Sequence, residues 1–280
     1  DISVGDGHAI VSAGRSSFRL PTLPVEDFPA ISSIDLPVNF ALSAADVRDL
    51  MDATRFAIST EETRYYLNGI FIHKAESGEL CAVATDGHRL ALTRQALPSG
   101  AAQMPSIILP RKAVNELRKL LDDFDGEVLV SLSETRAEFR FDVVRLTSKL
   151  IDGTFPDYTR VIPVGNDRIM QVDVVAFSAA VDRVATIASE KSRSVKMGLK
   201  PGLLTLSASN TDASSATEEL EVSYDGAEME IGFNARYLLD IAGQVNSEMV
   251  EFALADQGSP SLVRAPGDNA NLFVLMPMRV

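Results

Sequence analysis

Apolar residues recur at helical spacing in two separate segments of the chain. In the segment Ser43–Ser59 they occupy Val47, Leu50, Met51, Thr54 and Ile58. In the segment Asp173–Ser189 they occupy Phe177, Val181, Val184 and Ala188. Spacings of three and four residues place such positions on one face of a helix. Each segment is therefore predicted to be an amphipathic helix.

The same order of elements follows each of these helices. Alternating apolar and polar residues predict strands at Gly69–His73 and Leu80–Ala84, and again at Val195–Leu199 and Leu203–Ala208. Second helices are expected at Pro110–Asp123, with Pro110 in the first turn, and at Asn234–Asn246. Closing strands are expected at Glu127–Leu132, Arg136–Phe141, Met249–Leu254, Ser261–Ala265 and Leu272–Met276. The pattern predicts an α+β fold built from repeated domains, each with two helices on antiparallel sheets.

The beginning of the chain resembles the end of such a repeat. Arg145–Leu150 is a strand-like run followed by Phe155 and a proline, and Arg19–Leu23 is followed by Phe28 and a proline. Phe155 lies 127 residues after Phe28, the size of a domain rather than of a solenoid repeat. We therefore expect the end of a first domain at 1–36 and two full domains at 37–158 and 159–280. Chance similarity between ordinary α+β segments is the alternative.

Composition places the chain among globular, non-membrane proteins. Hydrophobic residues make up 46% and charged residues 23%. The apolar run Leu272–Met278 is far shorter than the roughly 20 residues that cross a bilayer. The segment Asp1–Asp6 has neither the basic nor the apolar region of a signal peptide. A single cysteine, Cys81, forms no internal disulfide, which favours the cytoplasm.

Motifs for catalysis and for metal or cofactor binding are absent from the sequence. There is no GxxxxGK[ST] phosphate loop, no GxGxxG after a strand and no GxSxG nucleophile turn. The one cysteine and three histidines are scattered, which argues against zinc. The acidic pairs Asp122-Asp123 and Glu61-Glu62 are expected at a helix end and in a loop. We therefore expect no catalytic site, no metal and no cofactor.

Three short motifs indicate a binding surface. Ala84–Leu90 reads ATDGHRL, a turn after a strand, and by spacing alone His88 and Arg89 could simply be exposed hairpin residues. The C-terminal run Phe273–Val280 is apolar, and its Pro277 is expected to end strand pairing and leave a methionine-rich tail on the surface. Packing in a final strand is the alternative for the tail. Arg64–Gly69, RYYLNG, pairs a cation with two aromatic rings.

Together these motifs resemble one family of proteins. RYYLNG, ATDGHRL, TSKLIDGTFPDYTRVIP at Thr147–Pro163, GAEMEIGFNARYLLD at Gly226–Asp240 and the closing LMPMRV resemble the bacterial DNA polymerase III beta subunit, the sliding clamp. The resemblance implies a non-catalytic processivity factor, an accessory subunit of a DNA-directed DNA polymerase. It implies three similar domains per subunit and a head-to-tail ring of two subunits around duplex DNA. Because most of a first domain is not in this sequence, we expect the chain itself to be a monomer or an irregular oligomer.

The family's peptide-docking pocket transfers to matching positions of this sequence. The partners implied are the polymerase III alpha subunit, the clamp loader, other polymerases and mismatch-repair proteins, each through a short peptide with a Gln and Leu or Phe anchors. The matching positions are Leu67, Thr85, Gly87, His88, Arg89, Leu90, Pro156, Arg160, Val161, Asn234, Tyr237, Val274, Leu275, Met276, Pro277, Met278 and Arg279.

Net charge is the main objection to DNA binding. The chain carries −13, whereas nucleic-acid binding usually needs a basic surface. The predicted helical segments Ser43–Ser59, Pro110–Asp123, Asp173–Lys196 and Asn234–Asn246 together carry +1, so the acid lies elsewhere. A ring that slides is expected to hold phosphates weakly. Candidate DNA-facing residues are Arg48, Arg55, Arg64, Tyr66, Arg111, Lys112, Lys119, Lys149, Arg183, Lys191 and Arg236, some of which are expected to be ordinary solvated charges.

Two other classes of function stay open on the sequence alone. A protein-interaction scaffold that never contacts DNA would suit the acidic composition. An enzyme with an unrecognised site between the repeats is the third possibility. Peptide binding combined with stimulation of DNA synthesis would separate the first class from the second.

Overall fold

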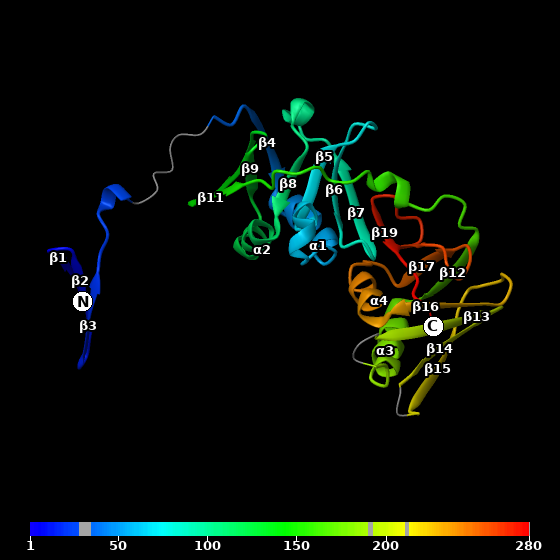
Figure 1. The fold of residues 1–280 in the computed structure, drawn as a ribbon. Coiled ribbons are helices and arrows are strands. Elements are labelled where there is room, and N and C mark those ends of the chain that lie inside the picture. The colour runs from blue at the N-terminus through cyan, green and yellow to red at the C-terminus, as the bar shows by residue number, and fades with distance from the viewer. Residues whose placement is uncertain (28–34, 190–192, 211–212, 280) are drawn as a thin grey trace. The chain divides into compact units, whose positions relative to one another are not determined.

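The structure is a computed structural model that describes residues 1–27, 35–189, 193–210 and 213–279 (Figure 1). The chain divides into two compact units, Asp1–Asp35 and Leu36–Val280, and each is described by itself. The predicted positions Phe28 and Lys191 lie outside the described residues.

The N-terminal unit is a small antiparallel meander. It contains β1 (Ile2–Gly5), β2 (His8–Ala13) and β3 (Ser16–Pro21), followed by the short 3-10 helix η1 (Val25–Asp27). Asp6 and Gly7 both have positive φ, as a tight two-residue hairpin turn requires. None of its strand residues is buried, and Phe18 and Leu20 are exposed.

The larger unit contains two copies of one order of elements. The central copy comprises β4 (Val38–Ser43), α1 (Ala44–Arg55), η2 (Glu62–Leu67), β5 (Gly69–Lys74), β6 (Glu79–Thr85), β7 (Arg89–Ala96), η3 (Ala101–Gln103), β8 (Ile107–Pro110), α2 (Arg111–Leu120), β9 (Glu127–Leu132), β10 (Arg136–Phe141) and β11 (Val144–Lys149). After η4 (Tyr158–Val161), the C-terminal copy comprises β12 (Arg168–Asp173), α3 (Val174–Ala185), β13 (Ser194–Lys200), β14 (Leu203–Ser209), β15 (Ser215–Glu221), β16 (Met229–Asn234), α4 (Ala235–Ala242), β17 (Met249–Leu254), β18 (Ser261–Arg264) and β19 (Asn271–Leu275).

The sheet order repeats between the copies as well. The central copy has a four-stranded sheet of order β11-β10-β9-β4, and the C-terminal copy supplies β19-β18-β17-β12 in the corresponding order. These last four strands continue into β7-β6-β5-β8 of the central copy, because β19 pairs antiparallel with β7. One eight-stranded sheet therefore spans both copies. The predicted α+β fold of repeated domains with antiparallel sheets is confirmed.

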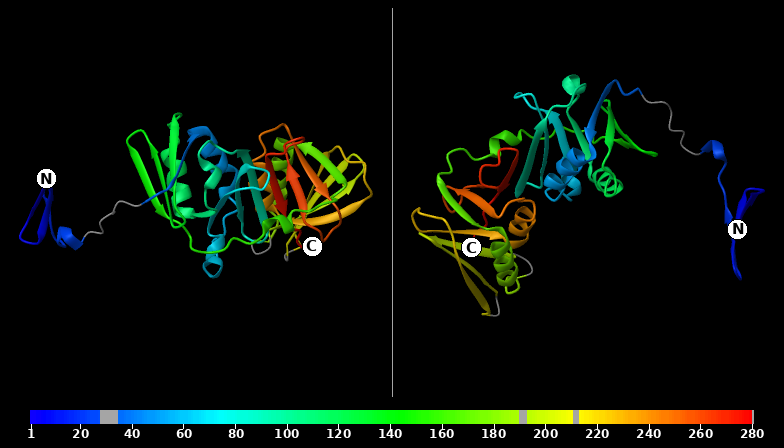
Figure 2. Two further views of the ribbon diagram at one scale, coloured as in Figure 1. Left: turned by 90° about the horizontal axis from the view of Figure 1, so that it is seen from above. Right: turned by 180° about the vertical axis from the view of Figure 1, so that it is seen from behind.

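The four α-helices cover one side of these sheets, while the sheets form the other side (Figure 1, Figure 2). Side-chain caps start three of the helices: Ser43, Asp173 and Asn234 each accept a hydrogen bond from a backbone N–H in the first turn of α1, α3 and α4. The buried faces are those predicted, with Leu50 and Met51 of α1 and Phe177 of α3 each 2% exposed or less. The main core lies between helices and sheets.

A second apolar cluster lies elsewhere in the larger unit. We call it the outer cluster, and its buried members are Leu67, Cys81, Val83, Leu90, Leu92, Ile108, Phe155 and Val274. Burial raises the pKa of the Cys81 thiol, as expected for a packing residue.

Three expectations about local structure are wrong. Pro110 ends β8 and caps α2 rather than lying in its first turn. Glu62 begins the 3-10 helix η2 and is not in a loop. The third, that the tail leaves the sheets after Pro277, is wrong only in part: β19 ends at Leu275 and both Met276 and Arg279 are exposed, as predicted, but the Met278 N–H donates to the Gly232 carbonyl at 2.8 Å and forms a bridge to β16. A proline removes only its own N–H, so pairing can resume one residue later.

Candidate functional site

A cavity of about 310 Å³ lies where the two copies join. The pairing of β19 with β7 sets Val274 opposite Leu90, and both side chains line the cavity. The remaining lining comes from η2, from the β6–β7 turn, from the segment 156–161 and from the end of β19. The full lining is Arg64, Tyr66, Leu67, Thr85, Gly87, Arg89, Leu90, Pro156, Asp157, Tyr158, Val161, Val274 and Met276.

The β6–β7 turn is fixed by its own polar groups. Thr85 Oγ1 donates to the Arg89 carbonyl at 2.7 Å and accepts from the Gly87 N–H at 3.1 Å. Asp86 Oδ1 accepts the N–H groups of His88 and Arg89. Gly87 has φ +89°, and a Cβ there would lie 2.6 Å from Arg64 Nη1. The backbone conformation therefore favours glycine at this position, and a Cβ there would make the flexible Arg64 side chain shift.

Arg89 is held by groups from three elements. Its Nε donates to Asp86 Oδ2 at 3.1 Å, its Nη1 to Asp240 Oδ2 of α4 at 2.5 Å, and its Nη2 to the Phe56 carbonyl at 2.6 Å. The guanidinium also lies over the Tyr237 ring, 4.3 Å from its centroid. The Arg89 side chain is 8% exposed. The alternative that spacing alone allowed, an exposed hairpin residue, is therefore wrong for Arg89. Arg89 joins the cavity wall to the helix layer of the C-terminal copy.

The segment 156–161 supplies part of the cavity lining, and Phe155 precedes it. Phe155 is buried and stacks on Phe71 with centroids 4.8 Å apart. The Tyr158 hydroxyl lies 3.0 Å from His73 Nε2, while His73 Nδ1 lies 3.1 Å from the Lys74 carbonyl. A carbonyl can only accept, so Nδ1 carries the proton and Tyr158 donates to Nε2. Burial raises the pKa of Tyr158 to about 12 and lowers that of His73.

η2 and the end of β19 complete the rim. Arg64 forms a bidentate pair with Glu61, and this hydrogen bond lowers the pKa of the Glu61 carboxyl. The Met276 N–H donates to the His88 carbonyl at 2.9 Å, and the Met276 side chain is 38% exposed. A flexible thioether at the rim of an apolar hollow adapts to differently shaped ligands.

The other predicted pocket residues are not part of the lining of this cavity. Leu275 is fully buried in the main core, and Asn234 caps α4. Tyr237 packs under Arg89 and beside His88, with the His88 and Tyr237 rings 6.4 Å apart. Arg160 is exposed and paired with Asp157. Pro277, Met278 and Arg279 line a different hollow beside β16.

The sequence reasoning assigned some lining residues differently or missed them. Arg64 and Tyr66, which were predicted as DNA-facing residues, both line the cavity. Asp157 and Tyr158 were not predicted as pocket residues, although they follow Pro156 directly in the FPDYTRV motif. Their position between two other predicted lining residues was a signal available in the sequence.

The chemistry of the cavity is that of a binding site for apolar side chains. Leu67, Leu90, Val161 and Val274 supply aliphatic surface, and a few fixed polar groups stand at the rim. In the described ranges no cluster of three His, Cys, Asp or Glu side chains could hold a metal ion. Likewise, no helix among the described residues is long and apolar enough to cross a membrane.

The candidate DNA-facing cations differ in the hydrogen bonds and ion pairs that they form within the protein. Arg48 on α1 donates to the carbonyls of Leu121 and Phe124 and pairs with Asp125, so it links α1 to the end of α2. Pairs with carboxylates also hold three exposed arginines: Arg55 with Asp52, Arg183 with Glu218 and Arg236 with Asp240.

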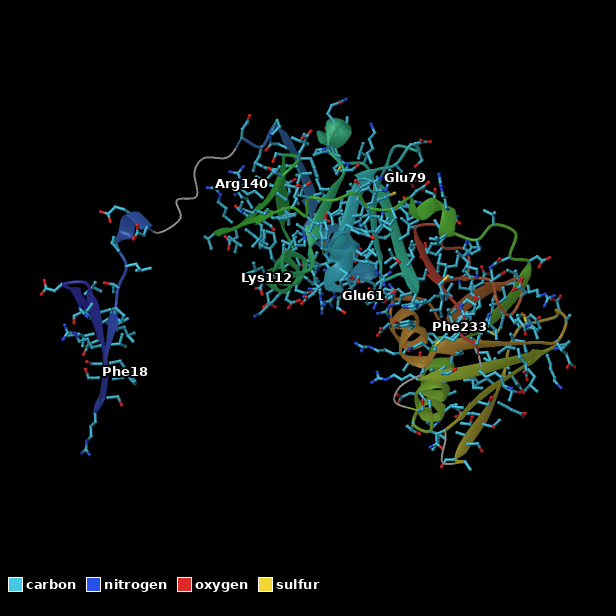
Figure 3. All side chains as sticks on the ribbon, in the orientation of Figure 1. Phe18, Glu61, Glu79, Lys112, Arg140 and Phe233 are labelled. Atoms are coloured by element: carbon cyan, nitrogen blue, oxygen red, sulfur yellow. The ribbon has the colours of Figure 1, made fainter. Side chains whose placement is uncertain are left out.

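The second helix of the central copy has the freest cations. Arg111, Lys112 and Lys119 are exposed on α2, and none of them forms an ion pair in the described part of the chain; Figure 3 labels Lys112 on this helix. Lys149 at the end of β11 is also exposed. On α1, by contrast, burial and the neighbouring carboxylates of Asp46 and Asp52 raise the pKa of Asp49. Positive charge on the helix layer is thus concentrated on α2.

Family comparisons cover almost all of the larger unit. The family model described as the central domain of the DNA polymerase III beta subunit matches residues 41–157, and the one for its C-terminal domain matches residues 159–279.

Individual relatives give the same result. The beta sliding clamp of Caulobacter vibrioides (strain NA1000 / CB15N) is 51% identical over 278 residues, which cover 98% of this chain and 75% of that protein. The beta sliding clamp of Pseudomonas aeruginosa is 41% identical over 290 residues, covering 100% of this chain and 76% of that protein.

Solved structures agree with the sequence matches. A crystal structure of the Bartonella birtlesii DnaN sliding clamp bound to griselimycin has a TM-score of 0.94 and 48% identity, covering 100% of this chain and 76% of that one. The C. crescentus beta sliding clamp with polyethylene glycol bound to a putative beta-motif tethering region has a TM-score of 0.93 and 51% identity, covering 100% and 75%. The chain therefore belongs to the family of the DNA polymerase III beta subunit, the beta sliding clamps.

Proposed function

We propose that the cavity between the two copies docks short peptide segments of proteins that work on DNA with the clamp. The partners proposed are the polymerase III alpha subunit, the clamp loader, other polymerases and mismatch-repair proteins. The observation that carries this proposal is the cavity itself, an apolar hollow with a fixed polar rim at the junction of β7 and β19. A related clamp was solved with polyethylene glycol at a putative tethering region, which is consistent with such a hollow.

The walls of this cavity suit a Gln and two apolar anchors. Leu67, Leu90 and Val274 form an aliphatic floor that favours burial of Leu or Phe side chains. The Arg64 guanidinium and the Thr85 hydroxyl at the rim offer polar partners for an amide side chain. Because the turn, Arg89 and Tyr158 are already held by hydrogen bonds, little ordering is required when a peptide binds.

Duplex DNA is the second proposed partner, on the helix side of the molecule. The exposed cations Arg111, Lys112 and Lys119 on α2 support this assignment. Most of the helix-layer arginines are neutralised by carboxylates, which favours loose phosphate contact over tight binding. Weak, sequence-independent contact is what sliding requires, since each tight phosphate contact adds affinity and salt dependence.

Ring formation by a full-length clamp is also a proposal. β15 is an outer strand of the sheet β15-β14-β13-β16, and β3 is an outer strand of the N-terminal meander. Unpaired strand edges of this kind are surfaces on which another chain can add a strand. Exposed Phe18 and Leu20 on β3 would supply apolar surface for such a contact.

A calorimetric titration tests the peptide cavity. The ligand is a short peptide with a Gln and Leu and Phe anchors, and the variants are Met276→Ala and Met278→Ala. We expect Met276→Ala to weaken binding about tenfold or more, because it removes one wall of the cavity. Met278→Ala is the matched control, since Met278 lines the hollow beside β16.

The two variants separate the part of the tail that lines the cavity, Met276, from the part that lines the hollow beside β16, Met278. Equal affinity of wild type and Met276→Ala would refute the assignment of the cavity. Deleting the tail from Pro277 is a poorer test, because it also removes the main-chain bond between Met278 and Gly232.

A further inference from the structure

A second hollow, the seam hollow, lies beside the candidate cavity in the central copy. Its volume is about 400 Å³. It lies at β8, an edge strand of the eight-stranded sheet, and β11, an edge strand of the four-stranded sheet of the central copy. Its lining includes the apolar residues Phe71, Ile108 and Phe155 and the polar residues Glu134, Asp152 and Thr154.

Main-chain bonds hold the seam hollow open. The Ile151 N–H donates to the Ile108 carbonyl at 3.0 Å, and the Leu150 N–H donates to the Thr135 carbonyl at 2.9 Å. The rings of Phe71 and Phe155 stack nearly parallel, 4° apart in plane. A ligand would therefore meet a preformed surface.

The seam hollow and the candidate cavity share one wall and one floor. Gly153 lines the seam hollow, and a Cβ on it would lie 3.0 Å from Cβ of Tyr66, which lines the cavity. Ile108 and Phe155 under the seam hollow belong to the outer cluster, as do Leu67, Leu90 and Val274 under the cavity. The divider is about one side chain thick, a distance that an extended peptide crosses in roughly three residues at about 3.3 Å each.

The rim of the seam hollow is acidic. Glu134 in the β9–β10 turn and Asp152 are exposed, and neither forms an ion pair within the described ranges. Asp157, on the cavity side of the same segment, is exposed too, although it pairs with Arg160. A peptide that leaves the cavity over residues 152–157 therefore passes carboxylates.

Comparison with the C-terminal copy shows which features of the seam hollow recur with the fold. There the Met278 N–H donates to the Gly232 carbonyl, as Ile151 does to Ile108, beside a hollow of about 570 Å³. Gln257 and Gly258 border that hollow as Glu134 and Thr135 border the first, and Arg279 lines it as well. The hollow recurs with the fold, but the stacked phenylalanines and the two unpaired acids belong to the central copy.

We propose that the seam hollow is a second subsite for the peptide that docks in the candidate cavity. It takes a Lys or Arg of the flanking sequence, whose methylene stem lies against Phe71 and Phe155 while its charge faces Glu134 and Asp152. This inference rests on the proposed peptide-docking function. It adds a preference for basic residues a few positions from the apolar anchors.

Titration calorimetry with three peptides tests the subsite. One is the minimal anchor peptide, and the other two carry a four-residue extension with a central Lys at the N-terminus or at the C-terminus. We expect one extended peptide to bind wild type about fivefold tighter than the minimal peptide. Asp152→Lys and Glu134→Lys should each remove this advantage and leave the affinity for the minimal peptide unchanged.

A matched control excludes general attraction to an acidic protein. Glu219→Lys makes the same charge change on β15, away from both hollows, and should keep the advantage of the extended peptide. Equal binding of all three peptides to wild type would overturn the subsite while leaving the cavity in place. So would an advantage that survives in both Asp152→Lys and Glu134→Lys. No binding of the minimal peptide would overturn the docking function and the subsite together.

Discussion

Arg89 is the residue on which the junction between the two copies depends most. Replacing it with methionine keeps an unbranched stem of similar length but removes the guanidinium. The Asp86 carboxylate, 17% exposed, then loses its cation, and the Asp240 carboxylate, 30% exposed, keeps only the longer contact with Arg236 at 3.8 Å. The Phe56 carbonyl loses a donor. Breaking a buried ion pair costs about 3–5 kcal/mol. Because Asp240 can be partly hydrated in the variant, we expect Arg89→Met to lower the free energy of unfolding by roughly 3 kcal/mol.

Urea unfolding followed by circular dichroism measures this loss. With a slope of about 3 kcal/mol per molar urea, the midpoint should fall by roughly 1 M. Arg160→Met is the matched control, because Arg160 is 83% exposed and pairs only with Asp157 in the described residues. Exposed pairs contribute about 0–1 kcal/mol, so this control should barely move the midpoint.

A second variant isolates the charge that Arg89 neutralises. Adding Asp240→Asn to Arg89→Met removes the carboxylate that the first change leaves with only its longer contact to Arg236. The double variant should therefore lose less free energy of unfolding than the two single variants lose together. Equal midpoints for Arg89→Met and Arg160→Met, or strict additivity with Asp240→Asn, would show that Arg89 does not hold the copies together as described.

Two further predictions concern the walls of the cavity. Gly87→Ala should cost about 1–2 kcal/mol and weaken peptide binding, because alanine is strained at φ +89° and its Cβ displaces Arg64; unfolding and calorimetry together measure both losses. Burial lowers the pKa of His73 below 6.5, so the unfolded chain binds a proton that the folded chain does not. His73 therefore costs stability as pH falls below about 6.5, and His73→Phe should reduce the loss in urea midpoint between about pH 7.5 and 5.5.

Much of the fold could be predicted from local pattern. The faces of α1 and α3 follow from apolar spacing, and β9, β10 and β17 have the bounds that alternation predicted. Such elements are determined by their own sequence, because the residues that face the core recur at fixed intervals. β12, β15 and β16 were not predicted; in β15 (Ser215–Glu221) the reason is its three glutamates, a residue type depleted in strands, so that it depends on a neighbouring strand to form.

The site could be predicted less completely, because its geometry depends on contacts far apart in sequence. No spacing rule shows that Arg89 reaches Asp240, which lies 151 residues further along the chain. The same holds for Arg48, which looked like a free cation on a helix face but binds the carbonyls at the end of α2. Arg64 is a further example, because no local pattern shows that its guanidinium packs against the turn at Gly87.

Methyl NMR of the methionines tests the central claim most directly, because Met276 lines the cavity while Met51 and Met197 are each 1% exposed or less in the core. Titration with the Gln-, Leu- and Phe-containing peptide should shift the Met276 methyl resonance to saturation at one peptide per chain. The resonances of Met51 and Met197 should stay in place. A peptide that binds without moving the Met276 resonance would contradict the account, because it would dock somewhere other than the junction of β7 and β19.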